Sequence, residues 1–339
     1  MKIKIIINIL ILLALIVSND WGQVTTTSII SKGNNKPDFL VKQYTVSNWN
    51  TKNGIPYVQR DGVSLGATSF QLLGDKKVAF LCNSSNEIII KDIADNTIIK
   101  KIPVLFAPKD FIYDNGLYYV LGESQIIVYD EQGNEIKKYL FPNRYAGTDR
   151  LIRYDNATYL LLPSGNSLQI EKAGVAINPQ EYEGWITSNG DFVKTKITGN
   201  YSYSVKVIKD NREIFNKVYS VNKKVAGVFV VGSTKNHIVL DVQTFTSENP
   251  IEVERMIVLI DLQKNNLGSI MSSIVIPDIY YVISNKDFYV SPNGNILNMI
   301  TTPRGVYVFT LKEDTLLNVN KGYPESLKSL KYHFNDHLK

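Results

Sequence analysis

Apolar and polar residues alternate through most of the chain, in short runs that end at turn residues. The stretch FIYDNGLYYVLGESQIIVYDEQGNEIKKYLFP, residues 111–142, alternates, turns at Asn115-Gly116, alternates again and turns at Gln132-Gly133. A period of two is that of a β-strand with one buried face. Asn-Gly and similar pairs suit tight hairpin turns because they tolerate positive φ. The stretch therefore predicts about four short antiparallel strands in one sheet.

The same pattern occurs in six units along the chain, at intervals of roughly 40 residues. The units begin at Phe70, Phe111, Ile152, Trp185, Phe229 and Phe288. A four-stranded unit of this period is typical of a β-propeller blade, because sheets stacked around an axis bury each other's faces. We therefore expect an all-β fold, a six-bladed β-propeller of four-stranded antiparallel blades. A seven-bladed ring stays open as an alternative if the N-terminal segment forms a degenerate blade.

The segment before the first unit also alternates, in FLVKQYTV at residues 39–46, whereas the sixth unit lacks a strong fourth strand. We expect this N-terminal strand to complete the last blade and close the ring. Near the C-terminus, Leu327, Leu330 and Phe334 have helical spacing. The expected organisation is a signal peptide at 1–22, an N-terminal arm with the closing strand at 23–62, the propeller at 63–322 and a tail able to form a helix at 323–339.

Two of the units carry a resemblance to a known superfamily. YDNGLYYVLGESQIIVYDEQGNEI and VSPNGNILNMITTPRGVYVFTL resemble blades of the six-bladed propeller superfamily that includes the NHL and TolB-like groups, and especially its exported bacterial propellers. The resemblance spans roughly residues 70–322, and the chain has neither the Trp-Asp pair of WD40 repeats nor the Gly-Gly pair of kelch repeats. It implies the architecture, and many unrelated functions share this fold.

The N-terminus has the pattern of a secretory signal peptide. Two lysines in MKIK precede an apolar run from Ile5 to Val17, which is short for a membrane span. We therefore expect a secreted or periplasmic protein with no membrane span in the mature chain; an N-terminal membrane anchor is the alternative. Cys82 is the only cysteine and lies in the apolar strand KVAFLC, so we expect no internal disulfide and a thiol packed in the core.

Charge and motif content argue against several classes of function. The net charge is +5 and the basic residues are scattered among acidic ones, whereas a nucleic-acid partner is typically bound by a concentrated basic stripe. Neither a glycine-rich phosphate loop nor a G-x-S-x-G motif occurs, and we expect no cofactor. His333 and His337 could share a helix face around a metal. A solvated tail is the preferred interpretation, because the pair lies at the chain end and the glutamate of H-E-x-x-H is absent.

Binding residues of a propeller are expected where loops from several blades converge. Four long segments are candidates, at 48–62, 141–149, 175–185 and 244–254. Aromatic and arginine side chains are typical anchors of binding surfaces, and exposed rings also stack on sugars. The candidate ligand-binding residues in these segments are Trp49, Tyr57, Arg60, Arg144, Tyr145, Tyr182 and Trp185.

These observations favour an exported, non-enzymatic binding or scaffolding module at the cell envelope, with a protein, a peptide or a glycan as its partner. A propeller enzyme of the lyase or glycosidase kind is the alternative. Glycosidases need two carboxylates about 5 to 10 Å apart, and four carboxylates near the blade starts could converge on the channel. They are Asp110, Asp149, Asp155 and Asp191. A further alternative is an accessory domain beside a cell-wall hydrolase.

Overall fold

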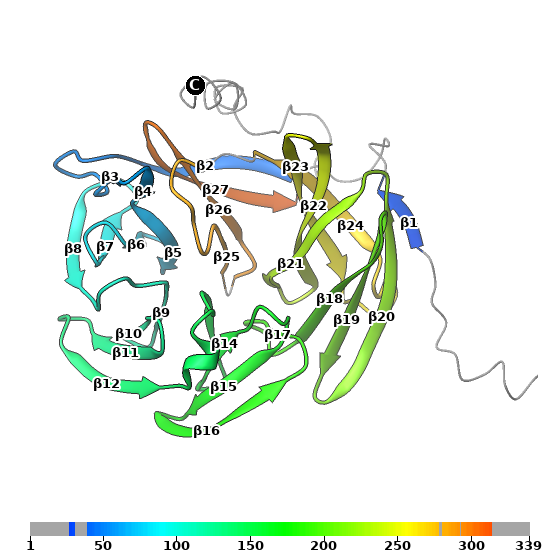
Figure 1. Ribbon diagram of the computed structural model, residues 1–339, viewed down its shortest axis with the longest axis horizontal. Helices are drawn as coiled ribbons and strands as arrows, with labels where there is room; N and C mark the ends of the chain where they lie inside the picture. Colours follow the sequence, from blue (N-terminus) through cyan, green and yellow to red (C-terminus); the bar gives the residue numbers. More distant parts are fainter. Residues whose placement is uncertain (1–26, 31–38, 278–279, 292, 314–339) are drawn as a thin grey trace, which may run out of the picture.

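Six four-stranded antiparallel blades stand around a central axis in the computed structural model, which describes residues 27–30, 39–277, 280–291 and 293–313 (Figure 1). In the first five blades, the strands follow one another in sequence from the centre of the ring outward. The chain is therefore a six-bladed β-propeller, which confirms the fold expected from the repeat.

The first three blades are built from short strands. Blade one contains β5 (Ala67–Leu73), β6 (Lys77–Cys82), β7 (Glu87–Asp92) and β8 (Ile98–Pro103). Blade two contains β9 (Asp110–Asp114), β10 (Leu117–Leu121), β11 (Gln125–Asp130) and β12 (Glu135–Leu140). Blade three contains β13 (Leu151–Tyr154), β14 (Ala157–Leu161), β15 (Ser167–Lys172) and β16 (Val175–Tyr182).

Several strands of the other three blades are longer. Blade four contains β17 (Trp185–Ile186), β18 (Phe192–Gly199), β19 (Ser202–Lys209) and β20 (Arg212–Val221), with β1 (Thr27–Ile30) added in parallel at its outer edge. Blade five contains β21 (Val225–Ser233), β22 (His237–Glu248), β23 (Ile251–Asp261) and β24 (Ile270–Ile276). Blade six contains β25 (Phe288–Val290), β26 (Ile296–Thr302), β27 (Gly305–Glu313) and β2 (Phe39–Asn48).

Three of the expected binding segments contain more regular structure than their loop-like sequences indicate. The segment 48–62 includes β3 (Val58–Arg60), which forms a two-stranded hairpin with β4 (Val63–Leu65). The segment 244–254 is the tip of the β22–β23 hairpin, and 175–185 is largely the outer strand β16. In each case the strand forms because a neighbouring strand supplies the hydrogen-bond ladder, which local composition does not reveal.

Each pair of neighbouring blades encloses an apolar cluster, because successive side chains of a strand point to opposite faces of its sheet. In β6, Phe80 belongs to the cluster shared with Met299 of blade six, whereas Leu81 belongs to the cluster shared with Phe111 of blade two. Such clusters lie between all six pairs of neighbouring blades in the described chain. Both faces of every blade are therefore covered, which explains the apolar runs in the middle strands of each unit.

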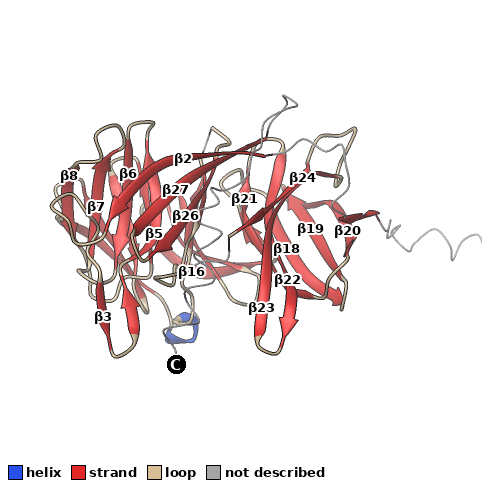
Figure 2. Cartoon of the chain, turned by 90° about the horizontal axis from the view of Figure 1, so that it is seen from above, coloured by secondary structure: helices blue, strands red, loops and turns tan. Residues whose placement is uncertain are grey.

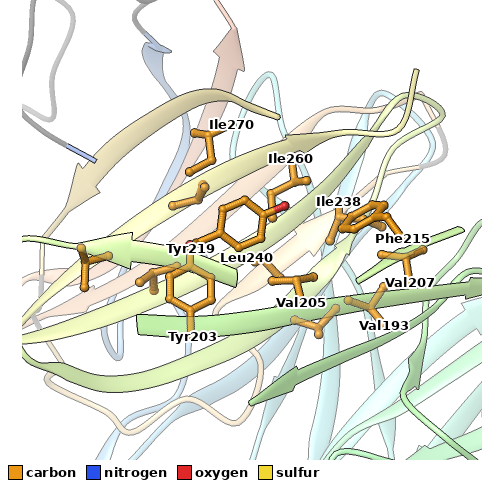
Figure 3. Close-up of a cluster of buried hydrophobic side chains, with 14 of the residues drawn as sticks. Val193, Tyr203, Val205, Val207, Phe215, Tyr219, Ile238, Leu240, Ile260 and Ile270 are labelled. Atoms are coloured by element: carbon orange, nitrogen blue, oxygen red, sulfur yellow. The ribbon is translucent and has the colours of Figure 1, made fainter. Parts of the chain in front are cut away.

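The cluster between blades four and five shows how large side chains fill this space (Figure 3). Tyr203 and Tyr219 of blade four stack with their ring centroids 5.4 Å apart, beside Leu240 and Ile260 of blade five. The buried Tyr219 hydroxyl donates a hydrogen bond of 2.8 Å to the Gly268 carbonyl. That bond offsets the cost of removing a hydroxyl from water, so the ring can contribute its full apolar area.

The outer strand of blade six comes from the N-terminal side of the chain. β2 pairs antiparallel with β27, with Gln43 opposite Phe309 and Asn48 opposite Gly305. Figure 1 shows the two strands side by side although most of the chain separates them in sequence. We predict that this pairing of β2 with β27 holds the ring closed.

Several expectations fall on residues outside the described ranges. They include the signal peptide at 1–22, the tail at 323–339 and the histidine pair His333 and His337. Within the part of the chain that the structure describes, no α-helix has the length and hydrophobicity of a membrane span.

Candidate functional site

The order of strands decides which connections lie on each face of the ring. The links between blades and the turns between second and third strands share one face, called here the connection face. The β3–β4 hairpin, the 3-10 turn η1 (Asn143–Tyr145) and the tip of the β22–β23 hairpin belong to it. Figure 2 shows β3 and the β22–β23 hairpin projecting on the same side of the ring. Three of the four candidate segments therefore have their projecting parts on one face.

A cavity of about 640 Å³ lies at the centre of the ring, between blades three, four and five and the link into blade six. Sites for small molecules commonly have about 300 to 1,000 Å³. Phe229 and Ile283 line the cavity and remain 44% and 77% exposed, so it is open to solvent. The cavity wall also includes polar and aromatic side chains, among them Asp149, Arg150, Trp185, Asp241, Gln243, Arg255, Tyr280 and Asp287.

One wall of the cavity is a buried ion-pair network centred on Arg255 of β23. Its guanidinium contacts Asp241 Oδ2 at 2.5 Å through Nη2 and Asp287 Oδ2 at 2.8 Å through Nη1. It also lies 5.2 Å from the ring of Tyr280, whose hydroxyl donates to Asp287 at 3.3 Å. Burial alone would lower the pKa of Arg255, but Asp287 and Asp241 outweigh it and raise that pKa. The arginine is therefore a fixed positive charge, and it holds two carboxylates in place.

One oxygen of the Asp241 carboxylate takes no part in this network. Asp241 Oδ2 accepts from both Arg255 and Gln243, the latter at 3.0 Å from Nε2. Asp241 Oδ1 is buried and has no hydrogen-bond partner within the described ranges. A buried acceptor without a donor costs about 1 to 3 kcal/mol, so a donor group brought by a ligand would find a favourable partner after a small side-chain shift.

Another wall is formed by Arg150 and Trp185. The Arg150 guanidinium lies 5.3 Å from the indole ring centroid, within the range of a cation–π contact. The indole is held by its own hydrogen bond, from Trp185 Nε1 to the Leu162 carbonyl at 2.8 Å. Among the described residues, no carboxylate forms an ion pair with Arg150, and its buried Nε has no hydrogen-bond partner. The stack thus places a cation that has no paired carboxylate among the described residues at the cavity wall.

Asp149 lies beside this stack at the cavity wall. Its pKa is raised above the ordinary aspartate value, mainly because the surrounding protein displaces water, with a further contribution from the charge of Asp110. The neighbouring Arg150 acts in the opposite direction. A carboxyl group that keeps its proton more readily can donate a hydrogen bond to an anionic ligand.

A second cavity of about 250 Å³ continues along the ring centre and shares Arg150 and Trp185 with the first. Lys286 lines it, and its Nζ lies 2.7 Å from Asp110 Oδ1. Asp110 also accepts from the Ser69 hydroxyl at 2.6 Å and from the Leu151 backbone N–H at 3.0 Å. The buried Asp110 therefore ties blades one, two and three to the link before blade six, and its oxygens are used in structural contacts.

The four carboxylates considered for an enzyme site do not converge. Asp110 and Asp149 are close enough to interact electrostatically. Asp155 is exposed in the β13–β14 turn with φ of 48°. Asp191 is buried before β18, 3.4 Å from Lys209 Nζ. The last two belong to turns between first and second strands, on the face opposite the connection face. The cavity contains a different set, Asp149, Asp241 and Asp287.

Trp185 is the one predicted ligand-binding residue among the seven that lines the large cavity. Trp49 and Tyr57 instead pack with Tyr281, at centroid distances of 5.4 Å between the first two and 5.0 Å between Tyr57 and Tyr281. Trp49 Nε1 donates to the Thr302 carbonyl at 2.7 Å. This aromatic group packs the junction of blades six and one.

The remaining predicted residues lie apart from the cavity. Arg60 is exposed on β3, and Arg144 lies over the ring of Tyr145 at 4.8 Å within η1. Tyr182 stacks on Phe192 at 5.2 Å, where the outer strand of blade three meets blade four. Six of the seven predicted ligand-binding residues, which were chosen by residue type and loop position, therefore lie outside the large cavity.

Sequence reasoning missed Arg150, Asp241, Arg255 and Asp287. A signal was present for two of them, since Asp241 interrupts the apolar run HIVLDV and Arg255 precedes MIVLI. A charge in an otherwise apolar strand is expected to be paired or functional, because isolated burial is costly.

Comparisons with known proteins identify the fold and no activity. No protein-family model matches the sequence, and no curated protein matches it. A solved Bacteroides fragilis protein described as exported is similar with a TM-score of 0.50 and 8% identity, over 84% of this chain and 98% of that chain. Identity this low shows a shared fold alone.

Two further solved structures are similar more weakly. Hydrazine synthase of Kuenenia stuttgartiensis has a TM-score of 0.47 and 14% identity, over 91% of this chain and 86% of that chain. Virginiamycin B lyase of Staphylococcus aureus has a TM-score of 0.43 and 12% identity, over 81% of this chain and 99% of that chain. Neither likeness is strong enough to support an argument about function.

Proposed function

We propose that the protein is an exported, non-enzymatic binding module of the cell envelope that takes a glycan or a peptide segment into its central cavity. The observation that carries this proposal is the composition of the cavity wall. Trp185, Phe229 and Tyr280 supply aromatic surface, and Arg150 and Asp241 each have a hydrogen-bonding atom without a partner among the residues that the structure describes. Ligand sites combine apolar lining with a few convergent polar groups in this way.

The charges in the wall favour binding over catalysis. Asp241 and Asp287 are both engaged by the guanidinium of Arg255. A pair of catalytic carboxylates needs environments that separate their pKa values, so that one acts as acid and the other as base or nucleophile. Asp241 and Asp287 are instead fixed by one guanidinium, which suits a fixed recognition surface better.

Export is supported by the N-terminal pattern of lysines followed by the apolar run from Ile5 to Val17. The Bacteroides fragilis protein of the same fold is also described as exported. The proposed division of the chain is a signal peptide at 1–22, an arm at 23–62, the propeller at 63–322 and a tail at 323–339.

The test is a thermal-shift and calorimetric screen of the purified chain against envelope polysaccharide fragments, neutral oligosaccharides and short peptides. A ligand present at a hundredfold excess over its Kd stabilises the folded chain by roughly 2.7 kcal/mol. We expect at least one ligand class to bind, and Trp185→Ala to weaken that binding at least tenfold. Tyr201→Ala is the matched control, because Tyr201 is an exposed aromatic residue of blade four that does not line the cavity. Equal binding by both variants would show that the central cavity is not the site.

A lyase or glycosidase activity is the second candidate, and Asp149 is the observation that favours it. Its raised pKa suits a general acid, and it shares the cavity with Asp241 and Asp287. Release of reducing ends or of unsaturated products from a bound polysaccharide, lost in Asp149→Asn, would establish this candidate. Binding without any product would leave the non-enzymatic function in place.

A further inference from the structure

The cationic side chains around the two central cavities differ in how their charge is compensated. Arg255 is paired with two aspartates, and Lys286 is paired with Asp110 at 2.7 Å. Arg153 contacts Asp114 at 2.9 Å and Glu171 at 2.8 Å. Arg150 alone among these four forms no ion pair with a described residue, although it lines both cavities. Among the described residues of the ring centre, Arg150 is therefore the cation without an ion-pair partner.

Arg150 is held in place by contacts of its side chain and its backbone. Its side chain is half-buried, it stacks on Trp185, and its covered Nε has no hydrogen-bond partner in the part of the chain that the structure describes. Its backbone is fixed where its carbonyl accepts from the Leu161 N–H at 3.0 Å. A covered donor without an acceptor is costly. A planar guanidinium fork is matched best by an anion that accepts two parallel hydrogen bonds, as a carboxylate does.

The same cavity limits how much negative charge a ligand can carry. Asp149, Asp241 and Asp287 line it, and only Arg255 and Arg150 oppose them there. A multiply charged phosphate group would meet more repulsion than a singly charged carboxylate. A ligand that combines one carboxylate with neutral hydroxyls is therefore the better electrostatic match.

The rest of the wall suits a sugar ring that carries such a carboxylate. Trp185 and the half-exposed Phe229 contribute aromatic carbons to the wall, and Gln243 and Asp241 contribute amide and carboxylate groups that can bind hydroxyls. Asp241 Oδ1 has no donor of its own. We propose that the ligand of the central cavity is an acidic saccharide, with its carboxylate bound by the guanidinium of Arg150 and its ring against Trp185. This inference rests on the proposed function, because it names the ligand class of the same site.

The experiment compares uronic-acid oligosaccharides with their carboxyl-reduced counterparts, which keep the ring and lose the charge. Oligomers of galacturonate, glucuronate and mannuronate serve as probes in isothermal titration calorimetry at 150 mM salt. We expect at least one acidic oligomer to bind tenfold or more tightly than its reduced form. Arg150→Met should remove that preference, and Arg150→Lys should keep part of it, because lysine retains the charge and loses the fork.

Arg144→Met is the matched control, since Arg144 is exposed on the same face but lies outside the cavity. It should keep the preference for the acidic form. The inference is overturned if acidic and reduced oligomers bind equally, if Arg150→Met keeps the preference, or if no acidic oligomer binds at millimolar concentration. In each of those cases, Trp185-dependent binding of neutral saccharides or peptides would still support the proposed function. Failure of the acidic-saccharide inference can therefore be distinguished from failure of the proposed function.

Discussion

The ammonium group of Lys91, on β7 of blade one, donates a hydrogen bond of 2.6 Å to the hydroxyl of Ser47 on β2 of blade six. Its second acceptor is the Asn53 carbonyl at 2.5 Å. Both Lys91 and Ser47 are fully buried, and no carboxylate forms an ion pair with Lys91 in the described chain. A buried cation thus joins the first and last blades through neutral acceptors alone.

The stability of the protein should depend on the titration of Lys91. Burial lowers the pKa of Lys91 to about 8, whereas an unfolded lysine has a pKa near 10.4. Between these values the unfolded chain binds the proton that the folded chain has lost, so the free energy of unfolding rises with pH, by at most about 1.4 kcal/mol per pH unit. Urea denaturation at pH 7.5, 8.5 and 9.5 should show this rise in the wild type relative to Lys91→Met. A constant difference between the two proteins across the three pH values would contradict the lowered pKa.

Removal of β2 should open the ring. A chain that starts at residue 49 leaves the edge of β27 without its partner and uncovers part of the cluster between blades six and one. Exposed strand edges promote association, so we expect a lower midpoint of thermal unfolding together with aggregation in light scattering. A chain that starts at residue 31 is the control, because it lacks β1 and keeps β2. Similar midpoints for the two chains would show that β2 does not hold the ring closed.

Substitution of Arg255 should destabilise the fold strongly. Arg255→Met leaves Asp241 and Asp287 without their shared cation, and removal of one member of a buried ion pair costs about 3 to 5 kcal/mol. Lys224→Met is the control, because it removes an ion pair with Glu248 whose partners are both exposed, and such pairs contribute about 0 to 1 kcal/mol. Unfolding free energies from urea titrations give the comparison. A loss in Arg255→Met no larger than in the control would mean that the two aspartates are already well solvated.

Binding of an acidic saccharide should weaken as pH rises through the pKa of Asp149. Burial and the charge of Asp110 raise that pKa above the ordinary value near 3.9. The protonated form donates to the ligand carboxylate, and the ionised form repels it. Calorimetric titrations from pH 4.5 to 7 should show a falling affinity in the wild type and a flatter profile in Asp149→Asn. The same slope in both proteins would assign the pH effect to another group.

The sequence predicted the architecture well because propeller blades are repeated local structures. The first strand of every unit was recognised at its correct place, from Phe70 to Phe288, since each strand is followed by a tight turn and a partner close in sequence. The outer strand β16 was missed, because its residues alternate poorly between apolar and polar. Its strand character comes from pairing with β15.

The site was predicted far less completely, for a physical reason. Arg255 and Asp287 are 32 residues apart and lie on opposite sides of a blade boundary. Arg150 is distinguished by the absence of an ion pair with any described residue, and a sequence does not display such an absence. Residue type and loop position gave Trp185, Trp49 and Tyr57 equal weight as ligand-binding residues. Trp185 lines the cavity, whereas Trp49 and Tyr57 pack against Tyr281.

The contacts around Asp110 have a consequence for how the chain reaches its native state. The Asn285 side chain donates to the Lys109 carbonyl and the Lys286 ammonium to the Phe111 carbonyl, across separations of 176 and 175 residues. An open repeat array can fold from any unit outward, because each repeat contacts only its neighbours. Here blades one and two receive these contacts only after the chain has been synthesised almost to its end. High contact order slows folding, so we expect the early blades to complete their packing only after the link before blade six has formed these contacts.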